Sequence, residues 1–199
     1  MTTEPTPRPR RIDPAAKRAA VLEAAARLFA RDGYSATTTA GIAREAGVAT
    51  GTVFRLFPDK AALLAALHLD IETRFAECMA EAWDACDAPA AERFEPMYRA
   101  LFALLAELRE RMPIMALGVA GAGAAAREPG SVIKARIEAQ YARAVAAGEL
   151  RSLPRGAVVH IVSGMVDGAM RHWLASPTAR RRQEAIRTLT EISLRAFAP

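Results

Sequence analysis

Histidine and cysteine, the residues most typical of metal sites and nucleophilic catalysis, are few in this 199-residue chain, which has three of the first and two of the second. The three histidines, His68, His160 and His172, show no HxxxH spacing and have no Cys/His cluster beside them. The sequence also contains no GxSxG nucleophile turn and no glycine-rich phosphate loop. We therefore expect no catalytic residue, no metal site and no cofactor, and we do not expect an enzyme.

The two cysteines, Cys78 and Cys86, fall in one segment with a helical pattern. Eight residues of helix, at about 1.5 Å per residue, separate them by roughly 12 Å along the axis. That separation is beyond the reach of a disulfide. We expect two reduced thiols; a redox-sensing pair is the alternative, and it would require the segment to unwind.

A denser set of polar groups lies in residues 37–60, which read "TTTAGIAREAGVATGTVFRLFPDK". Threonines open this stretch, two more flank Gly51, and Arg55 and Lys60 follow. Hydroxyl, guanidinium and ammonium groups are the donors that bind phosphate oxygens and base edges. This stretch is therefore the first candidate for a binding site.

The positive charge of the chain gathers in the same region. Residues 1–60 hold 10 Lys/Arg against 6 Asp/Glu, whereas the other 139 residues hold 17 against 16. A basic patch on a nearly neutral protein suits an acidic polymer such as nucleic acid.

The elements that must position these groups are predicted to be helices. Alternating strand patterns are missing, and Ala, Leu, Arg and Glu dominate the chain. We expect an all-α fold of about nine helices, with N-caps at Asp13, at Thr38 or Thr37, and at Asp59. Helices are expected to end at Gly33, Gly47 and Gly148, and Pro113 is expected to interrupt a helix. Phe29, Ile42, Val53 and Phe57 are expected in the core.

The chain divides by composition into three parts. Residues 1–12 are predicted to be a flexible basic arm, 13–58 a small helical domain and 59–199 a larger one. The longest uncharged run, 112–126, has 15 residues, which is shorter than the roughly 18–20 that a membrane span needs. The first residues are polar and basic and resemble no secretory signal. We expect a cytoplasmic protein with no membrane contact.

Two short helices joined by "AGV" around Gly47 fit a helix-turn-helix, in which Gly47 takes the turn where a side chain would clash. The wider register is more specific. The run from 21 to 67 resembles the TetR family of one-component transcriptional regulators. It matches in the helix ending "LFARDGY", then "ATTT", "IAREAGV" and "GTVFRLF", and in "K-x-x-L" opening a long helix.

The resemblance implies an N-terminal three-helix DNA-binding domain and a C-terminal helical domain for ligand binding and dimerisation. It implies DNA contacts from Thr38, Thr50, Gly51, Thr52, Phe54, Arg55 and Lys60. Arg55 is the candidate for reading a guanine, or else for clamping a phosphate. Lys60 would meet a phosphate at the start of the long helix.

Two positions depart from the family pattern. Phe54 stands where the family usually has a tyrosine, and Ala49 replaces the common serine cap. Both changes remove a hydroxyl that could meet the DNA backbone. Arg8, Arg10 and Arg11 of the arm could compensate by reaching into a minor groove.

The resemblance also implies an effector pocket and a dimer interface in the larger domain. The pocket candidates are the apolar and aromatic residues Phe75, Met79, Trp83, Met97, Leu101, Met115, Tyr141 and Met165. The interface candidates are His160, Asp167, Arg171, Ile186, Leu189 and Ile192. His160, Gly164, Asp167 and Arg171 share one polar helix face, which either meets the partner subunit or lines the pocket. The Ala/Gly connection at 118–130 could move as a gate.

The expected function is a ligand-responsive regulator, a repressor by family habit, that binds a palindromic DNA operator as a homodimer. A small apolar or aromatic effector would release it from DNA. The alternative is a helical adaptor that keeps the fold but has lost specific DNA binding.

Overall fold

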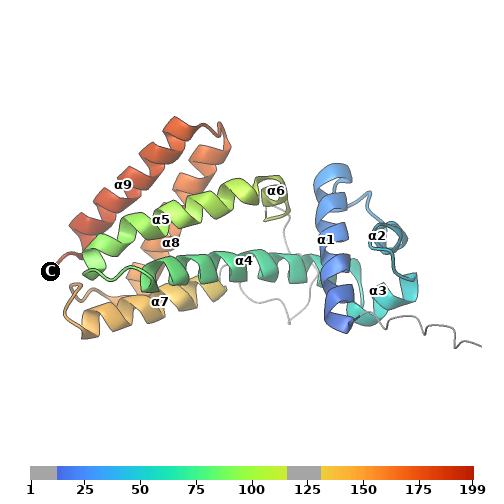
Figure 1. Ribbon diagram of the computed structural model, residues 1–199, viewed down its shortest axis with the longest axis horizontal. Helices are drawn as coiled ribbons and strands as arrows, with labels where there is room; N and C mark the ends of the chain where they lie inside the picture. The colour runs from blue at the N-terminus through green and yellow to red at the C-terminus, as the bar shows by residue number, and fades with distance from the viewer. Residues whose placement is uncertain (1–12, 116–130) are drawn as a thin grey trace, which may run out of the picture.

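The computed structural model describes residues 13–115 and 131–199, and this part of the chain is all-α, with nine α-helices and one 3-10 turn. A small unit, here called the head, lies at one end of a longer body (Figure 1). The head consists of α1 (Pro14–Asp32), α2 (Thr39–Glu45) and α3 (Thr50–Leu56). The body consists of α4 (Lys60–Asp84), α5 (Ala90–Glu107), η1 (Arg109–Arg111), α6 (Met112–Met115), α7 (Ser131–Ala146), α8 (Arg155–Leu174) and α9 (Ala179–Phe197). The predicted arm at 1–12 and the predicted connection at 118–130 lie outside the described residues.

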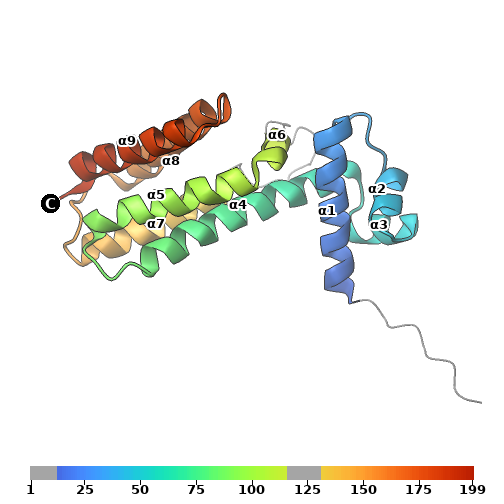
Figure 2. The same ribbon diagram turned by 45° about the horizontal axis from the view of Figure 1, so that its top comes forward.

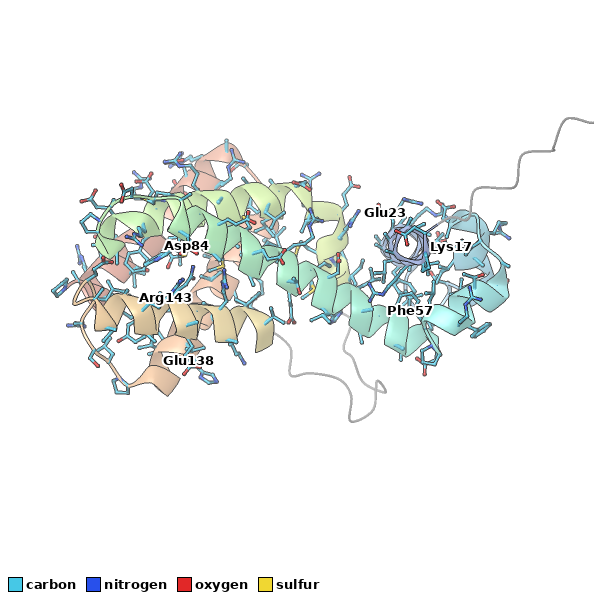
Figure 3. All side chains as sticks on the ribbon, turned by 60° about the horizontal axis from the view of Figure 1, so that its bottom comes forward. Lys17, Glu23, Phe57, Asp84, Glu138 and Arg143 are labelled. Carbon is cyan, nitrogen blue, oxygen red and sulfur yellow. The ribbon has the colours of Figure 1, made fainter. Side chains whose placement is uncertain are left out.

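The long helix α4 joins the two units. Its first turns pack against α1, and the rest of it runs beside α5 and α7 (Figures 1 and 2). Near its end, Asp84 accepts a hydrogen bond of 3.3 Å from Arg143 of α7 (Figure 3). Helices α8 and α9 pack on α5 and α7 and complete the body.

The core of the head shows why two short helices can be stable there. The predicted core residues Phe29, Ile42, Val53 and Phe57 are all buried, together with Leu63, Leu64 and Leu67 of α4. Burial of each such side chain contributes about 1.5–3 kcal/mol, which offsets the weak intrinsic stability of helices this short. The α1 and α4 helices therefore hold α2 and α3 in place.

The predicted helix boundaries in the head are confirmed. Asp13, Thr38 and Asp59 each accept a hydrogen bond from a backbone N–H in the first turn of the following helix. The physical reason for Gly47 differs from the one expected. Its φ of 66° is left-handed, and a side chain there would meet no atom within 4 Å. The turn needs a glycine because of its backbone conformation, and a clash has no part in it.

Two predictions from the sequence were wrong in the body. Helix α5 already ends at Glu107, and Pro113 is the second residue of α6, where its missing N–H breaks no helical hydrogen bond. Helix α4 ends at Asp84, so Cys86 lies beyond the helix that carries Cys78; both thiols are free. No helix within 13–115 and 131–199 is long and apolar enough to cross a membrane. In the same ranges no three His, Cys, Asp or Glu side chains gather as a metal site would require.

Candidate nucleic-acid interface and ligand cavities

Helices α2 and α3 form a compact pair held by the turn between them. The Gly47 N–H donates to the Arg44 carbonyl at 3.2 Å, and the Val48 N–H donates to the Ala43 carbonyl at 3.0 Å. Ala43 is buried, and its small side chain lets the two helices approach closely. The arrangement is a helix-turn-helix in which α3 takes the place of the recognition helix.

One face of α3 is packed into the head and the other is open. Val53 points into the core, whereas Thr50, Gly51, Phe54 and Arg55 are exposed. Phe54 is 51% exposed, which is unusual for a large aromatic side chain. Thr52 is half-buried at the edge of this face. The sequence-predicted residues of α3 therefore share one accessible surface, apart from the partly covered Thr52.

Gly51 has open space above its backbone. A Cβ built at this position meets no atom of the chain within 4 Å. The packing of the protein itself therefore does not require glycine at 51. The bare backbone permits close approach by an outside molecule.

Two arginines on this side of the head have no partner. Arg44 at the end of α2 and Arg55 of α3 are exposed, and neither makes a hydrogen bond or ion pair with the described residues. The carboxylates of the head are engaged elsewhere. Asp13 and Asp59 cap helices, and Glu45 accepts from Arg27 of α1 at 3.2 Å. The positive charge of Arg44 and Arg55 is thus not neutralised within the head.

Two arginines of α1 behave differently. Arg27 contacts both Glu23 and Glu45. Arg31 donates to both oxygens of Asp32, at 2.7 and 2.8 Å, and these bonds lower the pKa of the Asp32 carboxyl. Arg27 and Arg31 of α1 are therefore neutralised, whereas Lys17 and Arg18 near the start of α1 form no ion pair with the described residues.

The two threonines before α2 differ in exposure and in the hydrogen bonds that they make. Thr37 is buried, and its hydroxyl lies 2.8 Å from the Gly33 carbonyl, to which it donates. Thr38 is exposed, and its Oγ1 accepts from the Gly41 N–H at 3.1 Å. Because that bond uses Thr38 Oγ1 as an acceptor, its hydroxyl proton is free to donate to a phosphate.

Lys60 is engaged inside the protein. Its ammonium donates to the carbonyls of Tyr34, Ser35 and Thr37, at 2.7, 3.4 and 3.1 Å, and lies 4.3 Å from the centre of the Tyr34 ring. An ammonium has three N–H groups, so all of them are used. The sequence interpretation missed this role: Lys60 ties the loop after α1 to the start of α4, and a phosphate would have to displace one of these carbonyls.

Arg44 was not among the sequence-predicted contacts. Its place in the last turn of the first helix of a helix-turn-helix was the signal available, because that helix crosses the DNA backbone in this motif.

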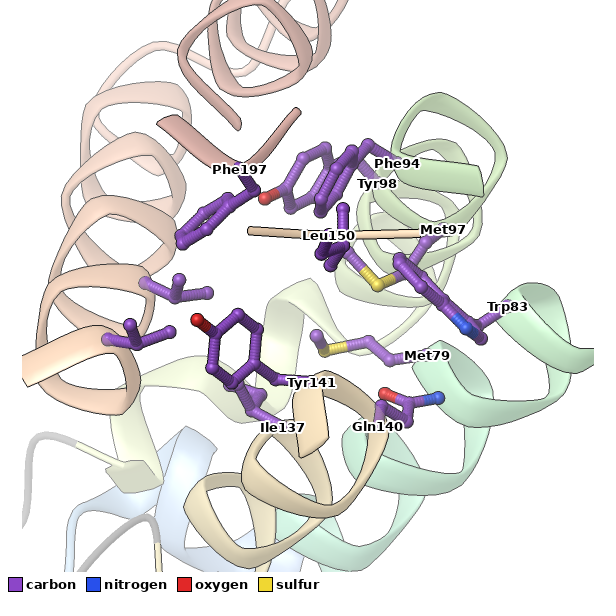
Figure 4. Close-up of a pocket in the computed structure, with 12 residues that line it drawn as sticks. Met79, Trp83, Phe94, Met97, Tyr98, Ile137, Gln140, Tyr141, Leu150 and Phe197 are labelled. Carbon is purple, nitrogen blue, oxygen red and sulfur yellow. The ribbon is translucent and has the colours of Figure 1, made fainter. Parts of the chain in front are cut away.

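Two of the cavities in the described part of the body are neighbours and hold most of the predicted pocket residues. The inner cavity, about 40 Å³, is lined by Met79, Trp83, Phe94, Met97, Tyr98, Ile137, Gln140, Tyr141, Leu150, Val158, Val162 and Phe197 (Figure 4). The outer cavity, about 480 Å³, is lined by Phe75, Met79, Leu101, Met112, Met115, Ile133, Lys134, Ile137, His160, Ser163, Gly164, Val166, Asp167 and Met170. Met79 and Ile137 border both.

Seven of the eight sequence-predicted pocket residues line one of these cavities. Trp83, Met97 and Tyr141 line the inner cavity, and Phe75, Leu101 and Met115 line the outer one. Met79 lines both, whereas Met165 lines neither and packs against the core of the body. Beside the inner cavity, burial raises the pKa of the Tyr98 hydroxyl, and the hydrogen bond to Ser193 lowers it in part.

The sequence-predicted interface residues separate into two groups. His160 and Asp167 are exposed at the outer cavity, and Arg171 forms an ion pair with Asp167. Ile186 and Leu189 were wrongly assigned, because each is 2% exposed and packs in the chain's own core. Ile192 is 42% exposed, and Ile161 of α8, which the sequence reasoning missed, is 58% exposed.

Comparisons with known proteins agree with this geometry. Residues 21–67 match the family model of bacterial regulatory proteins, tetR family. A structure described as a TetR-family transcription regulator from Shewanella sp. PV-4 is 26% identical, with a TM-score of 0.66 over 92% of this chain and 98% of that one.

Two further structures share the fold. The fatty acid degradation regulator FadR from Bacillus halodurans is 18% identical, with a TM-score of 0.76 over 89% of this chain and 94% of that one. FadR from Bacillus subtilis in complex with stearoyl-CoA is 22% identical, with a TM-score of 0.72 over 88% and 96%. The matched proteins are transcription regulators and not enzymes. Residues 21–67 thus match the DNA-binding domain of the tetR family, and the described part of the chain has the fold of structures described as TetR-family regulators.

Proposed function

We propose that this protein is a cytoplasmic, ligand-responsive repressor that binds a palindromic DNA operator as a homodimer. The observation that carries the proposal is the open face of α3, where Thr50, Gly51 and Arg55 are exposed and Arg55 has no partner among the described residues. Residues 13–58 would bind DNA, and residues 59–199 would bind the effector and the second subunit.

In this proposal α3 enters the major groove, which is about 12 Å wide. Arg55 is the base-reading or phosphate-clamping side chain, and Thr50 and Thr52 contact phosphates or base edges. Thr38 and Arg44 meet the backbone beside α3. Phe54 supplies apolar contact, which suits the methyl group of a thymine.

We propose a homodimer because the DNA-binding surface of one subunit is small. One short recognition helix neutralises few phosphates, so specific binding calls for two half-sites about 34 Å apart. We place the interface on the exposed faces of α8 and α9, where Ile161 and Ile192 are open to solvent. Arg171 and Asp167 would lie at its edge.

The cavities of the body support an effector that is small and apolar or aromatic. FadR from Bacillus subtilis, which shares this fold, holds stearoyl-CoA. Here methionine and aromatic side chains line both cavities, and such linings adapt to apolar molecules. An effector that binds the DNA-incompetent state more tightly would release the operator.

Selection and sequencing of random duplex DNA bound at about 0.15 M salt would test the proposal. The expected result is a palindrome whose half-sites change when Arg55 is replaced. No enrichment of any sequence would favour the adaptor that has lost DNA binding, a reading supported by the missing hydroxyls at Phe54 and Ala49.

A further inference from the structure

One buried amide in the body has no partner. Gln140 of α7 is 5% exposed, and its Nε2 makes no hydrogen bond with the described residues. Figure 4 shows the side chain in the wall of the inner cavity, beside Met79 and Trp83 of α4, with the amide oxygen on the cavity side and the nitrogen toward α4. A buried amide donor without a partner is unfavourable, and a half-turn of the amide about its last side-chain bond places Nε2 on the cavity side, where it can donate to an acceptor of a ligand.

The two tyrosine hydroxyls of this wall are satisfied. The Tyr141 hydroxyl donates to the Arg151 carbonyl at 2.9 Å and accepts from the Leu153 N–H at 2.7 Å. The Tyr98 hydroxyl is hydrogen-bonded to Ser193 at 2.8 Å. Trp83 and Gln140 are the lining residues whose polar groups make no hydrogen bond with the described residues, and the Trp83 nitrogen lies toward α4 (Figure 4), which leaves the Gln140 amide for a ligand.

Two other buried hydroxyls lack a partner, but they carry less information. Ser163 and Thr190 lie within helices, where a hydroxyl can rotate toward the carbonyl four residues before it. The Gln140 amide ends a longer side chain and lies beside the inner cavity (Figure 4).

The lining also limits the charge of a ligand. Apart from the two tyrosines, none of the twelve residues can ionise. The guanidinium of Arg93 lies 5.8 Å from the centre of the Trp83 ring, but Arg93 does not line the cavity and donates to the Ala88 carbonyl at 2.6 Å. A carboxylate or an amine would therefore lose its hydration without gaining a counter-charge.

The cavity has a means of enlarging. Its volume is about 40 Å³, and the flexible side chains of Met79 and Met97 form part of its wall. Met79 and Ile137 also border the outer cavity of about 480 Å³. Movement of the Met79 side chain would therefore change the shape of both spaces.

We propose that the inner cavity binds an uncharged, mainly apolar molecule through one hydrogen bond from Gln140 to an acceptor oxygen or nitrogen of the ligand. The inference rests on the proposed effector-binding function and adds the chemistry that the site selects. An aromatic ketone, aldehyde or ester has the required form, with a ring for the aromatic wall and one carbonyl for Gln140.

The test uses two probes of nearly the same shape, acetophenone and α-methylstyrene, which differ by a carbonyl oxygen in place of a methylene group. Their affinities for the full-length protein are measured by calorimetry or ligand-observed NMR, for the wild type, for Gln140→Leu and for Gln183→Leu. Gln183 is exposed on α9, so it provides the same substitution away from the cavity. Benzoate serves as the charged probe.

The quantity compared is the ratio of acetophenone affinity to α-methylstyrene affinity. The cost of taking the carbonyl out of water is the same for every variant, so a change in this ratio reports the hydrogen bond. We expect Gln140→Leu to lower the ratio about tenfold while α-methylstyrene still binds, and Gln183→Leu to leave it unchanged. Benzoate should bind more weakly than acetophenone.

An unchanged ratio in Gln140→Leu would overturn the inference, and so would a wild type that binds neither probe at millimolar concentration. Thermal unfolding gives an independent readout: Gln140→Leu should melt no lower than the wild type, because it removes an unpaired polar group. A clear drop in its melting temperature would show that the amide is held by something structural, such as a buried water.

Operator binding by the same samples separates this inference from the proposed function. If Gln140→Leu leaves the affinity ratio unchanged while the wild type still selects a palindrome, only the role of Gln140 is refuted. If Gln140→Leu lowers the affinity ratio but the wild type selects no DNA sequence, the ligand site stands and the proposed DNA-binding function is refuted.

Discussion

The head and the body pack their interiors differently. In the described part of the head, the buried hydroxyl of Thr37 is satisfied by the Gly33 carbonyl, and the apolar core is closed by α4. The body contains the inner and outer cavities. The three buried side-chain polar atoms without partners among the described residues, on Gln140, Ser163 and Thr190, also belong to the body.

The difference matches two kinds of binding. A surface that reads DNA must hold its side chains in a fixed register, which a filled core provides. A site for a small molecule needs unfilled space and polar groups that are not already hydrogen-bonded within the protein. The packed head suits the proposed role of α3 in DNA binding, and the cavities of the body suit the proposed binding of an effector.

Truncation of a core side chain should give the largest contrast between the two units. Ile42→Ala in the head should lower the free energy of unfolding by about 2–5 kcal/mol, because the closed core cannot collapse around the lost atoms. The loss for Met79→Ala should be smaller by at least about 1 kcal/mol, because Met79 already borders empty space and its truncation removes fewer contacts. Urea denaturation followed by circular dichroism measures both, and equal losses would contradict the contrast.

Lys60→Met tests whether this residue belongs to the fold or to the DNA contact. We expect a loss of about 1.5–3 kcal/mol in the free energy of unfolding, because three carbonyls lose a charged donor. The salt dependence of DNA binding should not change. Lys17→Met is the matched control in α1, where no partner is found among the described residues. A stable Lys60→Met protein whose salt slope falls by about 1 would instead assign Lys60 to a phosphate.

Arg55→Ala tests the exposed face of α3. Loss of about 1–3 kcal/mol in binding to the selected operator, with relaxed preference at one base pair, is expected for a base-reading arginine. Arg27→Ala removes an equally charged side chain from α1, where Glu23 and Glu45 already neutralise it, and should change DNA affinity little. Competition binding with operator variants measures both effects. Equal losses in the two variants would mean that the affinity comes from net charge alone.

Glu23→Gln probes the junction between the units and should have the smallest effect. Glu23 of α1 pairs with Arg111 of η1 at 2.5 Å, across the boundary of head and body (Figure 3). Because the pair is partly exposed, its loss should cost about 1 kcal/mol or less and shrink further in high salt. Glu95→Gln, which breaks a pair within α5, is the control. A loss of several kcal/mol, measured by thermal unfolding, would show that the junction is a main source of stability.

The sequence was most informative where structure is local. The capping roles of Asp13, Thr38 and Asp59 depend on backbone groups two or three residues away, so short patterns were enough to predict them. The exposure of Thr50, Gly51 and Arg55 followed from the same register, since Val53 and Phe57 had to face the core.

The features that the sequence could not predict depend on contacts between residues that are far apart in the chain. Lys60 binds carbonyls 23 to 26 residues before it, and no local pattern marks that contact. Ile186 and Leu189 lie on an amphipathic helix whose apolar stripe fits either the chain's own core or a partner subunit, and only packing distinguishes the two. Gln140 carries no sequence signal at all, because its significance comes from the cavity that surrounds it.

The salt dependence of duplex DNA binding tests the central claim most directly. It would be measured for the wild type and for Arg44→Ala/Arg55→Ala, between about 50 and 200 mM salt. A dimer that reads DNA through the open face of α3 should lose affinity steeply, with a slope of log affinity against log salt of about −5 or steeper. The double variant should give a shallower slope. A slope near zero for the wild type would contradict the account, because no phosphate would then be in contact with the protein.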